Sequence, residues 1–454
     1  MSHTPSTTLL HPDEIRSRFA RALSDMYRQE VPQYGALLDL VADINMEVIQ
    51  QNPSLEAILR DSNQLDRLNV ERHGAIRVGT PKELSTIARM FGVMGMTAVG
   101  YYDLSVANVP VHATAFRPVK EESLNRNPFR VFTSLLRLDL VEDVALRERA
   151  AEILSKRRIF TSRALELIDL AEQRGGLTQE EAEDFVSEAL ETFRWHREST
   201  VDIQTYQALR SSHPLVADVV CFKGPHINHL TPRVLDIDRA QSAMHTHEIR
   251  AKATIEGPPR RNVPILLRQT SFLALEEPVY FRGGEGAAGS HTARFGEIEQ
   301  RGYALTMKGR ALYDSLLQDA AGSSLDEAFT AFPDDLAILR KEGLAFFRYE
   351  INLERQAGSP KPDATLDQLV DSGWLRALPL TYEDFLPVSA AGIFHSNLGS
   401  ETHAEYSEAA DRAAFEAALG HQVLDEIALY EAAQAASVEE CRRRLKLGNC
   451  ELGS

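Results

Sequence analysis

Two ionisable side chains, those of His73 and Arg77, lie four residues apart in a stretch where apolar and polar residues alternate. Residues that differ by four on a β-strand point to the same side, so both side chains belong to the polar face. A metal-binding histidine beside a guanidinium would form an anion site, because the metal takes one end of the ligand while Arg77 forks onto a carboxylate. The ordinary alternative is a hydrogen-bonded structural or surface histidine.

A second candidate cluster runs from Gly224 to Pro232 and contains His226 and His229. These histidines differ by three, so on an extended strand they face opposite ways, and only one is expected to enter a common cavity. A helix would bring them to one face, but Pro225 and Pro232 disfavour a helix. For His226 we favour a structural role in the turn before the strand.

The third candidate group is Glu297 and Glu299, within the stretch from His291 to Gly302. Their spacing places both on the same side of a strand, so alternation does not choose between them, and solvent exposure is the ordinary explanation of either. One histidine from each of two units and one glutamate would form a site of two histidines and one carboxylate. On ferrous iron, such a site leaves positions open for a 2-oxo acid and O2.

Hydrophobic periodicity predicts the elements that must position these residues. Spacings of three and four predict helices at 15–26 and 37–48. Alternation predicts a strand at 68–78. A helix and three strands follow it, at 81–91, 97–104, 111–117 and 129–137. The order of this unit is therefore βαβββ.

A helical stretch at 140–209, with a capping box from Thr178 to Glu181, precedes a second unit. That unit repeats the order βαβββ at 226–234, 237–248, 249–256, 265–275 and 291–305. Helices at 325–349 and 409–444 follow. The sequence thus predicts an α+β protein whose two βαβββ units form a mixed curved sheet or barrel. Its expected parts are N-terminal helices, a first unit, an inserted helical layer, a second unit and a helical region closing over the site, at 1–64, 65–139, 140–215, 216–306 and 307–454.

The composition is that of an ordinary globular protein, with 454 residues of which 43% are hydrophobic and 25% charged. A net charge of −17 disfavours binding to nucleic acid or to anionic membranes, and an anionic substrate would need a local cation. Three widely spaced cysteines form neither a disulfide framework nor a zinc motif, and no apolar run reaches the length of a membrane span. We therefore expect a cytoplasmic protein without nucleic-acid or membrane partners.

Five ordered motifs are spread over nearly the whole chain: Arg72–Arg77, Ala113–Pro118, Asn127–Ser134, His229–Arg233 and Gly296–Gly302. Together they resemble the 2-oxoadipate dioxygenase/decarboxylase family, also called hydroxyglutarate synthase, whose fold is vicinal-oxygen-chelate-like. The resemblance implies that His73, His229 and Glu297 bind Fe(II). It also implies that His73 and Arg77 contact the substrate, together with Val388 in a C-terminal segment that closes on it.

The implied reaction is the Fe(II)-dependent oxidation of 2-oxoadipate by O2 to 2-hydroxyglutarate and CO2, a late step of lysine breakdown. Arg77 would take part in catalysis by holding a carboxylate of this 2-oxo dicarboxylate substrate and so positioning its chain. Two alternatives stay open at this point. One is a non-oxidative, metal-dependent isomerase or lyase of the same fold group, and the other is a metal- or small-molecule-binding protein without turnover.

Overall fold

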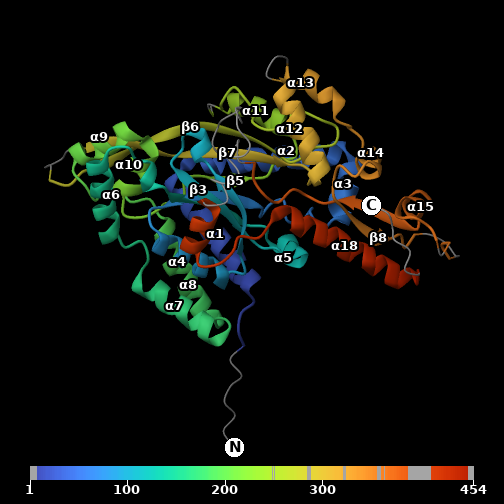
Figure 1. The fold of residues 1–454 in the computed structure, drawn as a ribbon, viewed down its shortest axis with the longest axis horizontal. Coiled ribbons are helices and arrows are strands. Elements are labelled where there is room, and N and C mark those ends of the chain that lie inside the picture. Colours follow the sequence, from blue (N-terminus) through green and yellow to red (C-terminus); the bar gives the residue numbers. More distant parts are fainter. Residues whose placement is uncertain are drawn as a thin grey trace, which may run out of the picture.

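The computed structural model describes residues 8–247, 249, 251–283, 288–320, 324–354, 359–361, 363–386 and 411–447. Helices alternate with three sheets, so the chain is a mixed α+β protein (Figure 1). The helices are α1 (Pro12–Glu30), α2 (Pro32–Gln51), α3 (Pro53–Asp61), α4 (Pro81–Val93), α5 (Glu121–Arg126), α6 (Val144–Lys156), α7 (Ser162–Arg174), α8 (Gln179–Phe193), α9 (Ile203–Ser212), α10 (Pro214–Cys221), α11 (Ile237–Thr246), α12 (Met307–Asp319), α13 (Leu325–Ala328), α14 (Leu336–Lys341), α15 (Leu366–Asp371) and α18 (Glu426–Leu445), with a further helical segment at 411–419. The strands are β1 (Arg72–Val78), β2 (Thr97–Asp103), β3 (Val111–Arg117), β4 (Arg130–Leu136), β5 (Leu230–Pro232), β6 (Leu267–Tyr280), β7 (Ala288–Arg301), β8 (Phe347–Ile351) and β9 (Leu375–Pro379).

The central sheet has five strands in the order β2-β3-β4-β1-β5. Strand β1 runs parallel to β4, and the other neighbouring pairs are antiparallel. Along the chain, the first unit shows the predicted order β1-α4-β2-β3-β4. The short strand β5 joins this sheet from the second half of the chain and pairs with the start of β1.

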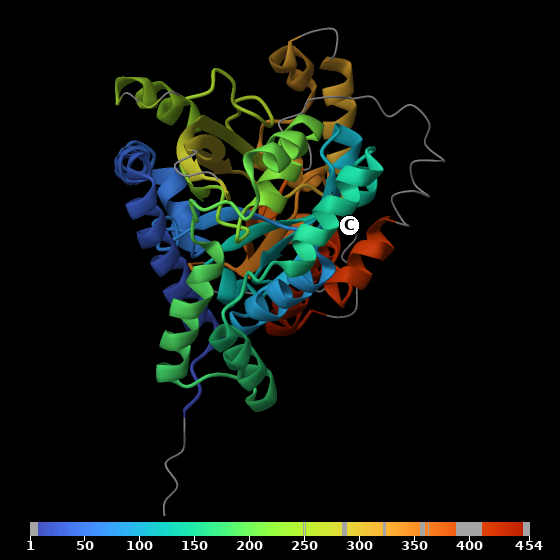
Figure 2. The same cartoon turned by 90° about the vertical axis from the view of Figure 1, so that its left-hand side faces the viewer.

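The two faces of β1 meet different surroundings, as the alternation predicts. Ile76 and Val78 are fully buried in a core shared with α1, α4, α7 and α8. His73 and Arg77, on the opposite face, line a cavity. The predicted capping box from Thr178 to Glu181 begins α8, which packs beside α1. Figure 2 shows these blue N-terminal helices next to the green helical insertion.

The second unit departs from its predicted order, because it contains β5, α11 and the long hairpin β6–β7 but lacks one strand. The described residues of 249–256 form only isolated bridges, from Ala251 to Phe272 and from Glu256 to Gln269. The two bridges join residues five apart in this segment to residues three apart on β6, so the two segments do not stay in register and no continuous ladder forms. The observed order is therefore βαββ.

No closed barrel forms in the part of the chain that the structure describes, so this alternative in the prediction is wrong. In Figure 1 the hairpin β6–β7 crosses the molecule above the central sheet. An isolated bridge between Arg233 and Glu299 joins β7 to the chain just after β5. Strand β5 has three residues and ends at Pro232, which has no N–H to extend a ladder.

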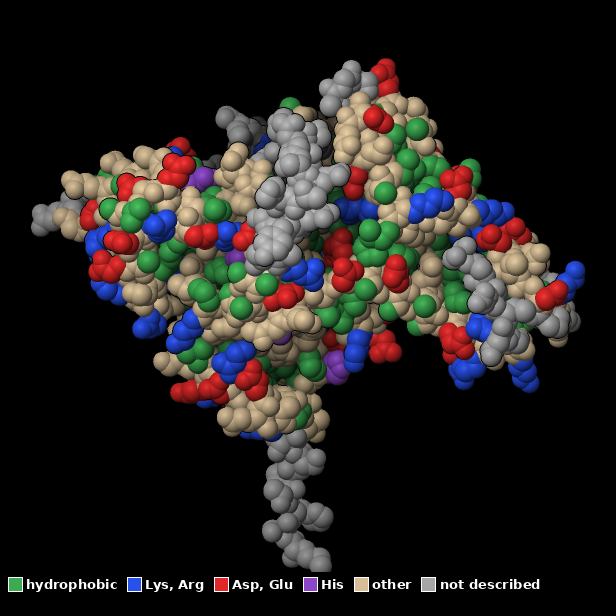
Figure 3. Space-filling view, viewed as in Figure 1, with side chains coloured by type: hydrophobic (Ala, Val, Ile, Leu, Met, Phe, Trp, Pro, Cys, Tyr) green, Lys and Arg blue, Asp and Glu red, His purple; other side chains and the backbone are tan. Residues whose placement is uncertain are grey.

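The C-terminal helices are shorter than predicted. The predicted helix at 325–349 is wrong, because the region divides into α13, α14 and β8, with Pro333 and Gly343 (φ 64°) between them. The predicted helix at 409–444 is interrupted at Gly420 (φ 91°), which separates 411–419 from α18. Among the helices of the described ranges, none is long and apolar enough to cross a bilayer. Acidic and basic side chains are mixed over the face in Figure 3.

Candidate metal centre and cavity

Three side chains singled out in the sequence, those of His73, His229 and Glu297, converge at one place. Each offers one ligand atom, and these atoms lie within 4.8 Å of one another. Oε1 of Glu297 lies 2.9 Å from Nε2 of His73 and 3.7 Å from Nε2 of His229. The two imidazole rings meet edge to face, with centroids 5.3 Å apart. The cluster thus joins residues that are distant in the sequence.

Strand pairing explains this convergence. His73 on β1 lies opposite Thr231 on β5, so His229 arrives two residues before that pair. Glu297 comes from β7, and its Oε1 accepts hydrogen bonds from Thr231 Oγ1 at 2.9 Å and from Gln269 Nε2 at 3.1 Å. The carboxylate is therefore held by contacts from β5 and from β6.

Burial and mutual contact set the protonation of the three groups. Burial lowers the pKa of His229 to about 4, so its imidazole is neutral at neutral pH. Burial opposes ionisation of Glu297, but His229 and His73 outweigh it and hold the pKa of this carboxyl below its usual range. Burial opposes protonation of His73, but Glu299 and Glu297 outweigh it and raise the pKa of His73. Neutral histidine and ionised carboxylate are the forms that bind a metal ion.

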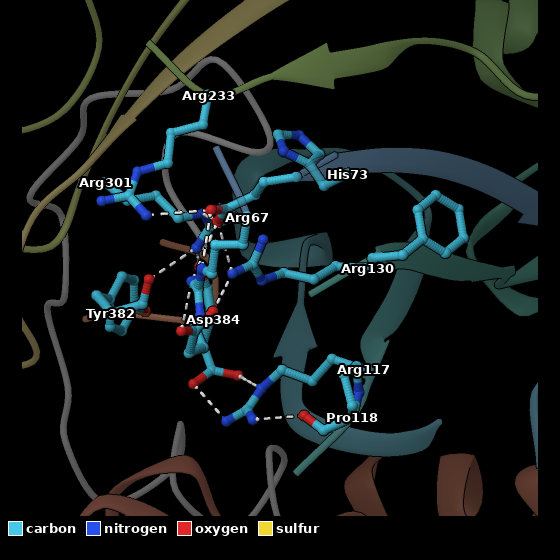
Figure 4. A network of polar contacts seen from close by, with 12 residues as sticks. Arg67, His73, Arg117, Pro118, Arg130, Arg233, Arg301, Tyr382 and Asp384 are labelled. Atoms are coloured by element: carbon cyan, nitrogen blue, oxygen red, sulfur yellow. Dashed lines mark hydrogen bonds and ion pairs between the residues drawn. The ribbon is translucent and has the colours of Figure 1, made fainter. Parts of the chain in front are cut away.

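The other side of His73 faces a buried network of arginines and carboxylates (Figure 4). Oε2 of Glu299 lies 2.9 Å from Nδ1 of His73, and Nε of Arg301 donates to Oε1 of Glu299 at 2.9 Å. The remaining pairs of this arginine–carboxylate network are Arg67–Glu71, Arg67–Glu383, Arg130–Glu71, Arg130–Glu383, Arg233–Glu71, Arg301–Glu71 and Arg117–Asp384. They connect the central sheet to the C-terminal region.

A cavity of about 460 Å³ opens in front of the three converging side chains, and Arg77 lies in the same wall. Nη1 of Arg77 donates to Oδ2 of Asp218 at 2.9 Å. Oδ1 of Asp218 also lies 2.9 Å from Nε2 of His291, whose Nδ1 lies 2.9 Å from the hydroxyl of Tyr206. A cavity of this size suits a small-molecule ligand, and a guanidinium in its wall suits an anionic one.

The structure distinguishes the candidate histidines and glutamates that sequence spacing alone could not distinguish. His229 lines the cavity, whereas His226 lies 3.5 Å from Asp218 outside the lining residues, so the expectation that only one of them enters is confirmed. Glu297 and Glu299 both face His73, but they meet different ring nitrogens. Val388 lies outside the described residues.

Several residues around the cavity were missed by the sequence reasoning. Asp218 is one, although a single acid inside the apolar helix α10 is a detectable signal of a buried charge. Phe385 is another: its ring lies 5.0 Å from the ring of His73, measured between centroids, and it lines the cavity. No sequence pattern marks Phe385, because its contact depends on how the C-terminal region packs.

The donor set fits a divalent metal ion, since two imidazole nitrogens and one carboxylate oxygen are the ligands of the facial iron sites. Nδ1 of His229 is buried and has no hydrogen-bond partner within the described ranges. The fold and the cavity therefore define an α+β protein in which two histidines and one carboxylate form a donor set that fits a metal ion, with the guanidinium of Arg77 in the same cavity wall.

The chain belongs to the 2-oxoadipate dioxygenase/decarboxylase family, whose sequence model matches residues 19–397. The resemblance seen in the motifs is thereby confirmed. The 2-oxoadipate dioxygenase/decarboxylase of Escherichia coli (strain K12) is 58% identical over 441 residues, which cover 94% of this chain and 98% of that protein. The enzyme of the same name from Pseudomonas putida is 57% identical over 463 residues, covering 98% of this chain and 100% of that protein.

A solved structure of similar fold is the hydroxyglutarate synthase from Pseudomonas putida in complex with 2-oxoadipate. It matches with a TM-score of 0.90 at 55% identity and covers 97% of this chain and 99% of that chain. The similarity thus extends over nearly the full length of both chains.

Proposed function

We propose that this protein catalyses the Fe(II)-dependent oxidative decarboxylation of 2-oxoadipate by O2 to 2-hydroxyglutarate and CO2, as a step of lysine breakdown. The observation that carries the proposal is one cavity wall that contains His73, His229, Glu297 and Arg77. Relatives named 2-oxoadipate dioxygenase/decarboxylase and a homologous structure with 2-oxoadipate support the choice of substrate. Both oxygen atoms of O2 are accounted for in the two products.

His73, His229 and Glu297 would hold the iron. When bound, Fe(II) would supply Lewis acidity and a template for the 2-oxo acid and O2. Glu297 contributes negative charge to the site, and Thr231 and Gln269 fix the orientation of its carboxylate. The ring of Phe385 meets the ring of His73 edge to face and would help to hold it in place.

Arg77 would bind a carboxylate of the substrate and so position the carbon chain for reaction. Asp218 occupies one of its nitrogens, Nη1, and thereby orients the guanidinium, whose side chain stays 26% exposed. A protein of net charge −17 needs such a local cation to hold a dianion. Val388 is proposed as a further substrate contact, since Phe385, three residues earlier, lies in the cavity wall.

We propose a vicinal-oxygen-chelate-like arrangement in which two related units supply the ligands, with His73 from the first and His229 and Glu297 from the second. The order β1-α4-β2-β3-β4 supports the first unit. The division into the five parts at 1–64, 65–139, 140–215, 216–306 and 307–454 is proposed on the same basis.

The test is oxygen consumption by the purified protein with 2-oxoadipate, with and without added Fe(II). We expect Fe(II)-dependent O2 uptake matched by equal amounts of CO2 and 2-hydroxyglutarate. Conversion of 2-oxoadipate under strictly anaerobic conditions would instead indicate an isomerase or lyase. Substrate binding without O2 uptake or product would indicate a binding protein, and either outcome would reject the proposal.

A further inference from the structure

His73 is enclosed between two carboxylates that come from the same strand. On β7, Glu297 and Glu299 share a face, and the imidazole of His73 spans both of them. Nε2 lies 2.9 Å from Oε1 of Glu297, and Nδ1 lies 2.9 Å from Oε2 of Glu299. Glu297 belongs to the cavity wall, whereas the side chain of Glu299 is fully buried.

The contact between His73 and Glu299 is exclusive within the described ranges. Neither Nδ1 of His73 nor Oε2 of Glu299 has another hydrogen-bond partner there. Each of these two atoms therefore has the other as its polar contact, at 2.9 Å. A buried carboxylate aimed at the ring nitrogen that points away from the cavity has no role in holding a substrate.

Glu299 is itself fixed by Arg301, which donates to its Oε1 from Nε at 2.9 Å. Nη1 of Arg301 donates to the carbonyl oxygens of Tyr382 and Asp384, both at 2.9 Å. In Figure 4, His73 and Arg301 lie in the upper part of the network, and the contact between Arg117 and Asp384 lies in its lower part. The position of Glu299 is therefore set by β7 and by the C-terminal region together.

We propose that Glu299 is a positioning residue that, held by Arg301, orients the ring of His73 for metal binding; the inference rests on the proposed metal site. A carboxylate at Nδ1 keeps the proton on that nitrogen and leaves the Nε2 lone pair for the metal. It also raises the basicity of the ligand nitrogen. In this arrangement the two glutamates of β7 have separate tasks, ligation by Glu297 and orientation of a ligand by Glu299.

The test measures metal binding by the full-length protein without substrate. The protein is stripped with a chelator and titrated with Co²⁺, whose absorption reports the ligand geometry. In Glu299→Gln, which keeps the shape but removes the charge, we expect Co²⁺ affinity to fall by about 10- to 100-fold and the absorption spectrum to change.

Glu383→Gln is the matched control, since Glu383 is a buried carboxylate of the same network that contacts Arg67 and Arg130 but is not paired with His73. We expect the affinity of this control for Co²⁺ to stay within about twofold of the native value. Losing a contact to a metal-binding side chain should have a much larger effect. Native-like affinity in Glu299→Gln would overturn the proposal. An equal loss in both variants would overturn it too, because the effect would then belong to the network as a whole.

A second variant covers the case in which Glu299→Gln does not fold. Glu299→Asp keeps the negative charge for Arg301 but withdraws the oxygen from Nδ1 of His73. Its Co²⁺ affinity should fall while its thermal unfolding stays close to native, and unchanged affinity would contradict the proposal. A native protein that binds Co²⁺ but does not oxidise 2-oxoadipate would reject the proposed activity alone, whereas a native protein that binds no Co²⁺ would reject the metal site and this inference.

Discussion

On its Nε2 side, His73 faces a cavity of about 460 Å³, whereas on its Nδ1 side it faces the arginine–carboxylate network. The side chains of Glu297 and His229 on the cavity side keep 14% and 11% of their surface exposed. Those of Glu299 and Glu71 on the network side keep none. One histidine therefore separates groups that can accept a ligand from groups that are already paired.

The comparison shows how side chains that must stay free for a metal ion or a substrate are held in position by their neighbours. Groups that must bind a metal ion or a substrate cannot also be fully paired within the protein, so other residues must hold them. Here Glu71 pairs with Arg67, Arg130 and Arg233 and ties the start of β1 to neighbouring elements. Buried ion pairs of this kind add little net stability, but breaking one leaves an uncompensated charge.

The largest effect is expected on the cavity side, from Glu297→Ala. Losing a ligand removes metal-dependent stabilisation worth several kcal/mol, so turnover of 2-oxoadipate should fall by about three powers of ten or more. Metal content and O2 uptake are the measurements. Glu256→Gln is the control, since Glu256 lines the same cavity outside the cluster. Retention of metal by Glu297→Ala would remove Glu297 from the ligand set.

The network side should respond in stability instead. Glu71→Gln leaves four buried arginines without full compensation and should lower the free energy of unfolding by about 3 to 5 kcal/mol, measured by chemical denaturation. The control is Glu152→Gln, which breaks exposed pairs with Lys156 and Arg149 and should change stability little. Equal effects of the two variants would mean that burial of the network has no energetic consequence.

A smaller effect on the cavity side is expected from Arg77→Lys. Lysine keeps the charge and can still meet Asp218, but it loses the planar fork. Losing one charge-assisted hydrogen bond costs about 1.5 to 3 kcal/mol, so KM for 2-oxoadipate should rise by roughly 10- to 150-fold. A 2-oxo acid with one carboxylate should be affected less. Arg210→Lys, in the same cavity wall, is the control, and an unchanged KM in Arg77→Lys would make Arg77 structural.

Local patterns in the sequence predicted the parts of this comparison that depend on one strand. The two-residue repeat of a β-strand placed His73 and Arg77 on one face of their strand. The same repeat placed Glu297 and Glu299 on one face of a second strand. Periodicity could not divide the roles of the two glutamates, because that depends on which ring nitrogen each one meets. The register between β1 and β5 and the position of β7 decide it.

The arginine–carboxylate network could not be predicted at all. Arg67 and Glu383 are 316 residues apart, and each looks like an ordinary surface charge in the sequence. The missing strand at 249–256 reflects a loss of register with β6, which depends on chain-distant pairing. The divided C-terminal helices have another cause, since glycines with positive φ and a proline outweigh a weak hydrophobic pattern. Chain-distant pairing and backbone breaks are therefore the two sources of error.

The smallest effect is expected from a substitution of Glu426, which lies at the edge of the network and begins α18. Burial and the negative charge of Asp384 raise the pKa of Glu426 to about 8, although Arg310 and Arg117 oppose this. The folded state therefore keeps a proton that the unfolded state releases above about pH 4.5. Stability is lost as the pH rises from about 4.5 to about 8, and the loss is constant beyond that.

Glu426→Gln removes this ionisation and should raise the melting temperature by about 1 to 3 °C at pH 8 while leaving it unchanged at pH 4. Tyr102, whose hydroxyl donates to Glu426 at 3.4 Å, can still donate to the amide oxygen. Thermal unfolding at the two pH values is the measurement, with the exposed Glu431→Gln on the same helix as control. A gain of equal size at both pH values would mean that packing, rather than the charge of Glu426, limits stability here. A gain confined to high pH would show that burial beside Asp384 keeps the carboxyl of Glu426 protonated in the folded state.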